Sequence, residues 1–173
     1  ALAPTTDPRP LWSLGLALAI FDLDNTLLAG DSDYLWGVYL AERGIVNGEA
    51  YERENERFYR EYCEGRLDIF EFLRFSLRTN VFVTAPIAER LGVPNLIATV
   101  PARSAGRYTG EVEGTPAFQE GKVERLLSWL RKTCVSLHGS TFYSDSYNDI
   151  PLLKRVDNPV AVDPDEGLVG HAR

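Results

Sequence analysis

Three predicted strands of this chain each stop at an aspartate, and this pattern constrains the fold more than any other feature. The strands cover residues 15–21, 140–144 and 159–162, and they are followed directly by Asp22, Asp145 and Asp163. The first of them is a continuous apolar run. A continuous apolar run of this length is typical of a strand that is buried on both faces of a parallel sheet. Because the carboxyl ends of parallel strands meet at one edge, we expect these aspartates to gather there.

Helical patterns fill most of the chain between these strands. We expect helices within residues 31–77, 82–91, 121–132 and 149–156, a further strand at 95–100 and a short β excursion at 107–114. In the helix of residues 121–132 the inward positions are Val123, Leu126, Leu127 and Leu130. Strands that alternate with helices predict an α/β fold with a doubly wound parallel sheet, whose ligands bind beyond the carboxyl ends of the strands.

Composition limits the partners that the protein can have. A chain of 173 residues with 45% hydrophobic and 25% charged residues is typical of one globular domain, with or without a small insertion. Its formal charge of −7 argues against binding nucleic acid or an anionic membrane, since both need clustered cations. Cys63 and Cys134 lack the spacing of a metal site or a disulfide framework, and the apolar run at residues 11–21 is too short to span a bilayer. We therefore expect a cytoplasmic protein.

Two carboxylates follow the first run within three residues. Strand alternation points Asp22 and Asp24 to the same side, with Leu23 opposite. Carboxylates so placed repel each other unless a cation lies near them or one of them is protonated. An ordinary Asx turn explains the five residues 22–26 about equally well, because Asp and Asn are common turn residues.

A second acidic turn follows the predicted strand at residues 140–144. Asp145 or Ser146 would serve as a helix N-cap, but this turn also contains Asn148 and Asp149, which a cap does not need. Together the two turns would place three carboxylates at one sheet edge. Such a set of hard oxygen ligands suits Mg²⁺.

Lys122 lies at the beginning of a predicted helix, in Glu-Gly-Lys-Val. A cation is unfavourable at the amino-terminal end of a helix, so helix stability does not explain this residue. An isolated lysine is usually just solvated. Near a carboxylate cluster and a phosphate, however, it would balance negative charge.

Three segments resemble, in order, motifs I, III and IV of the haloacid dehalogenase superfamily. They are Phe-Asp-Leu-Asp-Asn-Thr-Leu-Leu at residues 21–28, Gly-Lys-Val at 121–123, and Tyr-Ser-Asp-Ser-Tyr-Asn-Asp-Ile-Pro-Leu-Leu at 143–153. The chain is most similar to subfamily IB, the phosphoserine-phosphatase-like group that includes histidinol-phosphatases. The resemblance implies a Mg²⁺-dependent hydrolase of small phosphomonoesters, of the phosphoserine or histidinol phosphate class, that works through an aspartyl phosphate. It also implies a catalytic core of residues 11–30 and 79–173 and a helical cap of residues 31–78.

The resemblance assigns roles to individual residues. Asp22 would be the nucleophile and a Mg²⁺ ligand, and Asp24 the general acid and base that binds the metal through its backbone carbonyl. Lys122 would contact Asp22 and the phosphoryl group. Asp145 would be a second metal ligand, and Asp149 a supporting carboxylate at the metal. Asn148 would make a polar contact near the phosphate, and Asp31 would be an acidic residue that contacts the substrate.

The chain departs from the family at motif II, an apolar strand that ends in a phosphate-binding hydroxyl. The matching region, residues 75–80, has only the tail of the motif, with Thr79 as its candidate phosphate ligand, and no apolar strand precedes it. Either the strand is lost, or a piece of the protein is missing before Thr79 although the numbering runs on. We favour the second explanation, which predicts a gap between consecutive Cα atoms that exceeds the usual 3.8 Å.

Two other functions fit the same motifs. One is a phosphomutase or phosphotransferase that uses the same phosphoaspartate. The other is a binding protein without activity, which a true loss of motif II would favour. Retention of Asp22, Asp24, Lys122, Asp145 and Asp149 together argues against the second of these.

Overall fold

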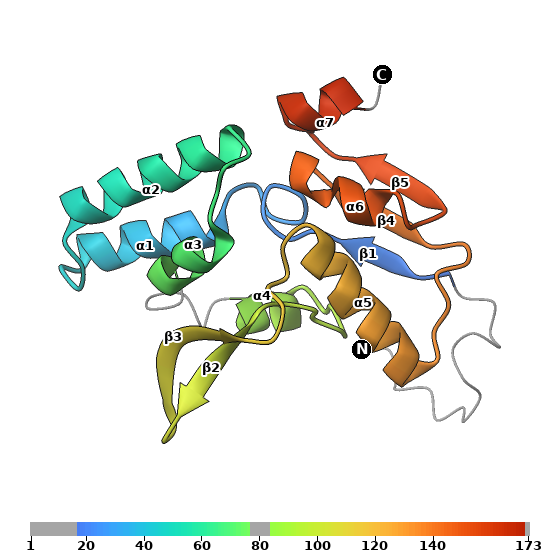
Figure 1. Cartoon of the computed structure of the whole chain (residues 1–173), viewed down its shortest axis with the longest axis horizontal. Coiled ribbons are helices and arrows are strands. Elements are labelled where there is room, and N and C mark those ends of the chain that lie inside the picture. The colour runs from blue at the N-terminus through green and yellow to red at the C-terminus, as the bar shows by residue number, and fades with distance from the viewer. Residues whose placement is uncertain (1–16, 77–83, 172–173) are drawn as a thin grey trace.

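The computed structural model describes residues 17–76 and 84–171, and it contains a parallel sheet, which is drawn in the right half of Figure 1. The sheet contains β1 (Ala19–Phe21), β4 (Thr141–Ser144) and β5 (Asn158–Ala161), in the order β1-β4-β5. All pairs are parallel, with Ile20 opposite Phe142 and Tyr143 opposite Val160. Because β4 lies between two partners, its Phe142 is only 1% exposed. The predicted α/β fold with a parallel sheet is confirmed.

Helix α5 (Glu120–Thr133) supplies one side of the hydrophobic core. Its apolar residues recur every three or four positions, so Val123, Leu126 and Leu130 lie on one buried stripe, with Leu127 partly buried beside them. The helix ends where Cys134 adopts a left-handed conformation, with φ of 56°. The core is completed by Phe142 of β4 and by side chains that follow β4 and β5, namely Leu152, Leu153, Val156 and Leu168. The predicted helix and its inward face are confirmed.

Three shorter helical elements follow β4 and β5. They are the 3-10 turn η2 (Tyr147–Asp149), α6 (Ile150–Leu153) and α7 (Glu166–His171). Helix α6 is shorter than the helix expected at residues 149–156, and the sequence patterns did not predict α7. Asp165 begins α7 by accepting a hydrogen bond from the amide of Leu168 at 2.7 Å, which is a capping contact.

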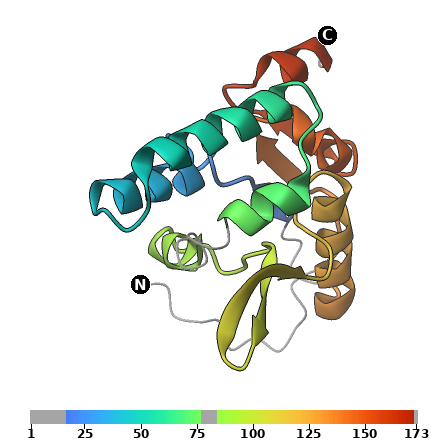
Figure 2. The same ribbon diagram turned by 60° about the vertical axis from the view of Figure 1, so that its left-hand side comes forward.

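Residues 32–76 form three helices, α1 (Ser32–Glu42), α2 (Gly48–Cys63) and α3 (Ile69–Ser76), which confirm the helical pattern. Each helix begins at a capping residue whose side chain accepts a hydrogen bond from a backbone amide of the first turn. The capping residues are Asp31, Asn47 and Asp68 respectively. Aromatic rings join them, with centroids 5.1 Å apart for Tyr51 and Phe75. Figures 1 and 2 show α1 and α2 lying side by side, apart from the parallel sheet.

The chain then forms α4 (Thr84–Arg90) and an antiparallel hairpin of β2 (Val100–Ser104) and β3 (Arg107–Glu113). The hairpin confirms the β excursion expected at residues 107–114. The strand expected at residues 95–100 is wrong, since only Val100 joins a strand and Leu96 is 46% exposed. A strand needs a partner for its backbone groups, and no strand of the described residues pairs with residues 95–99.

The expectation that the first strand is buried on both faces is also wrong. Phe21 is 45% exposed, because β1 pairs with β4 on one side and with no other strand of the described residues. Most of the region expected to contain a chain break, together with Thr79, lies outside the described residues. Within residues 17–76 and 84–171, no helix is long and apolar enough to cross a membrane.

Candidate active site

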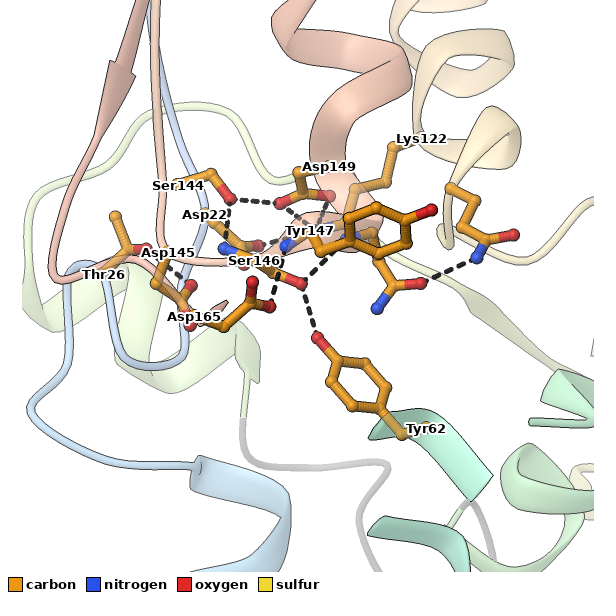
Figure 3. A network of polar contacts seen from close by, with 12 residues as sticks. Asp22, Thr26, Tyr62, Lys122, Ser144, Asp145, Ser146, Tyr147, Asp149 and Asp165 are labelled. Carbon is orange, nitrogen blue, oxygen red and sulfur yellow. Dashed lines mark hydrogen bonds and ion pairs between the residues drawn. The ribbon is translucent and has the colours of Figure 1, made fainter. Parts of the chain in front are cut away.

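Lys122 and two carboxylates form the centre of a polar network at the carboxyl edge of the sheet (Figure 3). Asp22 extends β1, because its amide donates to the carbonyl of Tyr143 at 2.9 Å. The Nζ of Lys122 lies 2.9 Å from Asp22 Oδ1, and 2.7 and 2.9 Å from the two oxygens of Asp149. The predicted contact between Lys122 and Asp22 is confirmed.

Two features keep Lys122 charged and in place. Burial alone would lower the pKa of its amine, but the charges of Asp149 and Asp22 outweigh burial and raise that pKa above the ordinary lysine value. The preceding residue, Gly121, lets α5 begin very close to the loop before it, since a Cβ there would lie 1.9 Å from the carbonyl oxygen of Pro116. The two carboxylates thus explain a cation at an unfavourable helix end.

Asp149 contacts the ammonium group of Lys122 through both oxygens of its carboxylate. Its side chain is fully buried and receives a hydrogen bond from Ser144 Oγ at 2.7 Å. Burial raises the pKa of Asp149, and the charge of Lys122 opposes that rise. Within the described ranges, no three acidic, His or Cys side chains are arranged to bind a metal ion.

Asp145 is tied to the turn that contains Asp22. Thr26 Oγ1 donates to Asp145 Oδ1 at 3.0 Å, which joins the loops after β1 and β4. Burial raises the pKa of Asp145, and the charge of Asp22 adds to this rise, whereas Thr26 and Lys122 lower it. The two carboxylates therefore repel each other, and oxygen donors in this relation fit a divalent cation.

Asp24 and Asp31 both lie at the beginning of α1. The amide of Ser32 donates to Asp24 Oδ1 at 2.8 Å, and the amide of Tyr34 donates to Asp31 Oδ1 at 2.9 Å. Burial raises the pKa of Asp24, the hydrogen bonds from Ser32 lower it, and the charges of Asp31 and Asp22 raise it further. Asp31 thus has a local role as a helix cap, in addition to the substrate contact predicted for it.

Asn148 is buried and its amide oxygen accepts a hydrogen bond from Gln119 Nε2 at 2.7 Å. Gln119 has an unusual backbone conformation for a residue other than glycine, with φ of 49° and ψ of −122°. Sequence reasoning missed Gln119, Ser144 and Tyr62 as members of this network. Residue type gave no signal for them, because Gln, Ser and Tyr occur widely in solvated or packed positions.

Comparisons with known proteins identify the family of the chain. The sequence profile of the haloacid dehalogenase-like hydrolase family matches residues 78–154. A histidinol-phosphatase from Neisseria meningitidis serogroup C (strain 8013) is 38% identical over 209 aligned positions, which cover 90% of this chain and 94% of that protein.

Solved structures share the fold. A crystal structure of a protein of unknown function from Bordetella pertussis Tohama I has 36% identity and a TM-score of 0.80, covering 90% of this chain and 94% of that one. A substrate-bound phosphoserine phosphatase, at 19% identity and a TM-score of 0.58, covers 84% of this chain and 85% of its own and shares the fold. The chain therefore belongs to the haloacid dehalogenase-like hydrolase family, and it is a phosphatase of that family.

Proposed function

We propose that the protein hydrolyses a small phosphomonoester of the histidinol phosphate or phosphoserine class through a phosphoaspartate on Asp22. The observation that carries the proposal is Lys122, whose ammonium group lies between Asp22 and the buried Asp149. The class of substrate is taken from the Neisseria relative and from the subfamily that the motifs resemble. We propose further that α1, α2 and α3 form a cap over a core that carries Asp22, Lys122 and Asp145.

In the first step, one carboxylate oxygen of Asp22 attacks phosphorus and the alcohol leaves. Lys122 already holds Oδ1 of Asp22 at 2.9 Å, so the nucleophile is oriented before substrate arrives. The same ammonium group would neutralise negative charge on the phosphoryl oxygens while the phosphoryl group is transferred to Asp22. A carboxylate nucleophile divides hydrolysis into two displacements, and the second frees phosphate from Asp22.

Asp24 is the proposed general acid and base. It would donate a proton to the leaving alkoxide in the first step, and then take a proton from the water that attacks the phosphoaspartate. Its hydrogen bond from the amide of Ser32, at 2.8 Å, fixes the side chain at the junction of the core and α1. This position would bring the acid close to the leaving group under the cap.

The donor set around Asp22 suits Mg²⁺. The carboxylates of Asp22 and Asp145 and the carbonyl of Asp24 would hold the ion, while Asp149 would support the site through Lys122. When bound, Mg²⁺ neutralises charge on the transferring phosphoryl group. The mutual repulsion of Asp22 and Asp145 supports a cation at this place.

The test is phosphate release from histidinol phosphate and phosphoserine, with and without Mg²⁺. We expect turnover that needs Mg²⁺ and that Asp22→Asn abolishes, because an amide is a poor nucleophile and a weak metal ligand. Asp163→Asn is the matched control, since exposed Asp163 also follows a strand of the sheet and should leave turnover unchanged. If Asp22→Asn hydrolyses the substrate as fast as the unmodified protein, the mechanism is contradicted. If the phosphoryl group passes to another molecule and no free phosphate is released, the protein is a phosphotransferase.

A further inference from the structure

Tyr62 joins the helical segment to the loop after β4. It lies in the last turn of α2, and its hydroxyl oxygen is 2.5 Å from Ser146 Oγ, although the two residues are 84 positions apart. Figure 3 shows the ring of Tyr62 reaching from α2 toward Ser146. Its neighbour one turn earlier, Tyr59, is 71% exposed, so the inward position of Tyr62 is not shared by every tyrosine of the helix.

The contact partner of Tyr62 belongs to the network that holds Lys122. We call residues 145–149 the catalytic turn. Ser146 Oγ accepts from the amide of Asn148 at 3.1 Å, and the amide of Ser146 donates to Ser144 Oγ at 3.1 Å. Ser144 Oγ in turn donates to Asp149 Oδ2, which contacts Lys122. Hydrogen bonds therefore run without interruption from α2 to Lys122 and Asp22.

We propose that Tyr62 is a positioning residue, whose hydroxyl fixes the catalytic turn and thereby places Asn148, Asp149 and Lys122 for phosphoryl transfer. The proposal rests on the proposed function for its catalytic part alone. Burial raises the pKa of Tyr62, so the phenol stays neutral and can donate to Ser146. Ser146 is itself buried, and a buried hydroxyl without its partner costs more than an exposed one. The catalytic turn would then be ordered fully only when α2 lies against it.

The experiment compares Tyr62→Phe with Tyr59→Phe, which makes the same chemical change on the exposed face of the same helix. Hydrogen–deuterium exchange of peptides that cover residues 141–153 reports the order of the catalytic turn. Steady-state kinetics on histidinol phosphate with Mg²⁺ reports the reaction. We expect faster exchange of the turn in Tyr62→Phe, a fall in kcat of about tenfold, and a KM within about twofold. Tyr59→Phe should match the unmodified protein in both measurements.

Two results with Tyr62→Phe would contradict the proposal. Unchanged exchange in Tyr62→Phe overturns it, and a raised KM with unchanged kcat makes Tyr62 a substrate contact instead. If Tyr62→Phe does not fold, Ser146→Ala breaks the same contact from the core side, and unchanged exchange of α2 in that variant overturns the proposal. If the unmodified protein shows no turnover, the proposed function fails, while the exchange measurement still decides whether Tyr62 orders the turn.

Discussion

Lys122 shows how far a single residue can be understood from sequence. Its place at a helix beginning, where a cation is unfavourable, indicated a charged partner elsewhere in the fold. The structure supplies Asp22 as the predicted partner and adds Asp149, whose side chain is buried completely. Sequence could not rank these two partners, because the closeness of Asp149 depends on Ser144 and on the turn after β4. Tertiary contacts of this kind leave no local pattern.

Lys122→Met tests the balance of charge at this residue. The change keeps the length of the side chain but leaves Asp149 buried without a cation. We expect the free energy of unfolding to fall by about 2–3 kcal/mol, somewhat less than for a fully buried pair because Lys122 is partly exposed. Phosphatase activity should fall at least about 100-fold. Denaturant unfolding and phosphate release measure the two effects.

Lys132→Met is the matched control for this change. Lys132 lies in the last turn of the same helix and is exposed, so its loss should change stability by no more than about 0.5 kcal/mol. If Lys122→Met behaves like this control, Lys122 neither balances Asp149 nor takes part in catalysis.

At the scale of elements, the sequence predicted the helices and strands whose pattern is local. It did not predict correctly where a strand depends on a partner that is distant in the sequence. Helix α5 repeats apolar residues at helical spacing, and its inward face was predicted correctly. The apolar segment at residues 95–100 reads as a strand, yet residues 95–99 pair with no strand of the described residues. The Asp at the end of β1 was found because it follows the apolar run, whereas the exposure of Phe21 depends on the sheet order.

Gly121→Ala tests the approach of α5 to the preceding loop. Alanine in a helix is favoured over glycine by about 1 kcal/mol, but the added Cβ would lie 1.9 Å from the backbone oxygen of Pro116. Moving backbone to relieve such a contact typically costs about 1–3 kcal/mol, so after the gain in helix propensity we expect a net loss of stability of up to about 2 kcal/mol. Because Lys122 follows directly, activity should fall about tenfold as well. Thermal unfolding and kinetics measure the outcome.

Gly170→Ala is the control for helix propensity, because this helical glycine has nothing within 4 Å of an added Cβ. It should be neutral or slightly stabilising. A Gly121→Ala protein as stable as this control would mean that α5 can move away from Pro116 without cost.

At the scale of the whole molecule, the described part of the parallel sheet has β1 at one edge. Among the described residues β1 pairs only with β4, and Phe21 is exposed beside it. The alignment with the Neisseria relative spans 209 positions, more than the 173 residues of this chain, so that relative has residues without a counterpart here. The family profile begins to match at residue 78, directly after α3 ends at Ser76. We therefore expect the additional residues of the relative to include a strand that pairs beside β1.

Inserting the additional residues of the Neisseria relative after Ser76, in front of the family-profile match, tests this expectation. We expect the segment to add a strand beside β1 and to cover Phe21, and burying the exposed 45% of this side chain is worth about 1 kcal/mol. The melting temperature should therefore rise by several degrees, since about 1 kcal/mol shifts it by about 2–4 °C in a chain of this size.

The control is a Gly/Ser linker of equal length at the same position, which lengthens the loop but cannot cover an apolar side chain. If the two insertions behave alike, β1 is an edge strand by nature, and catalysis must proceed without a neighbouring strand to bind the phosphate. If the relative's segment alone raises both the melting temperature and phosphate release, the open edge marks a lost strand that the active site needs.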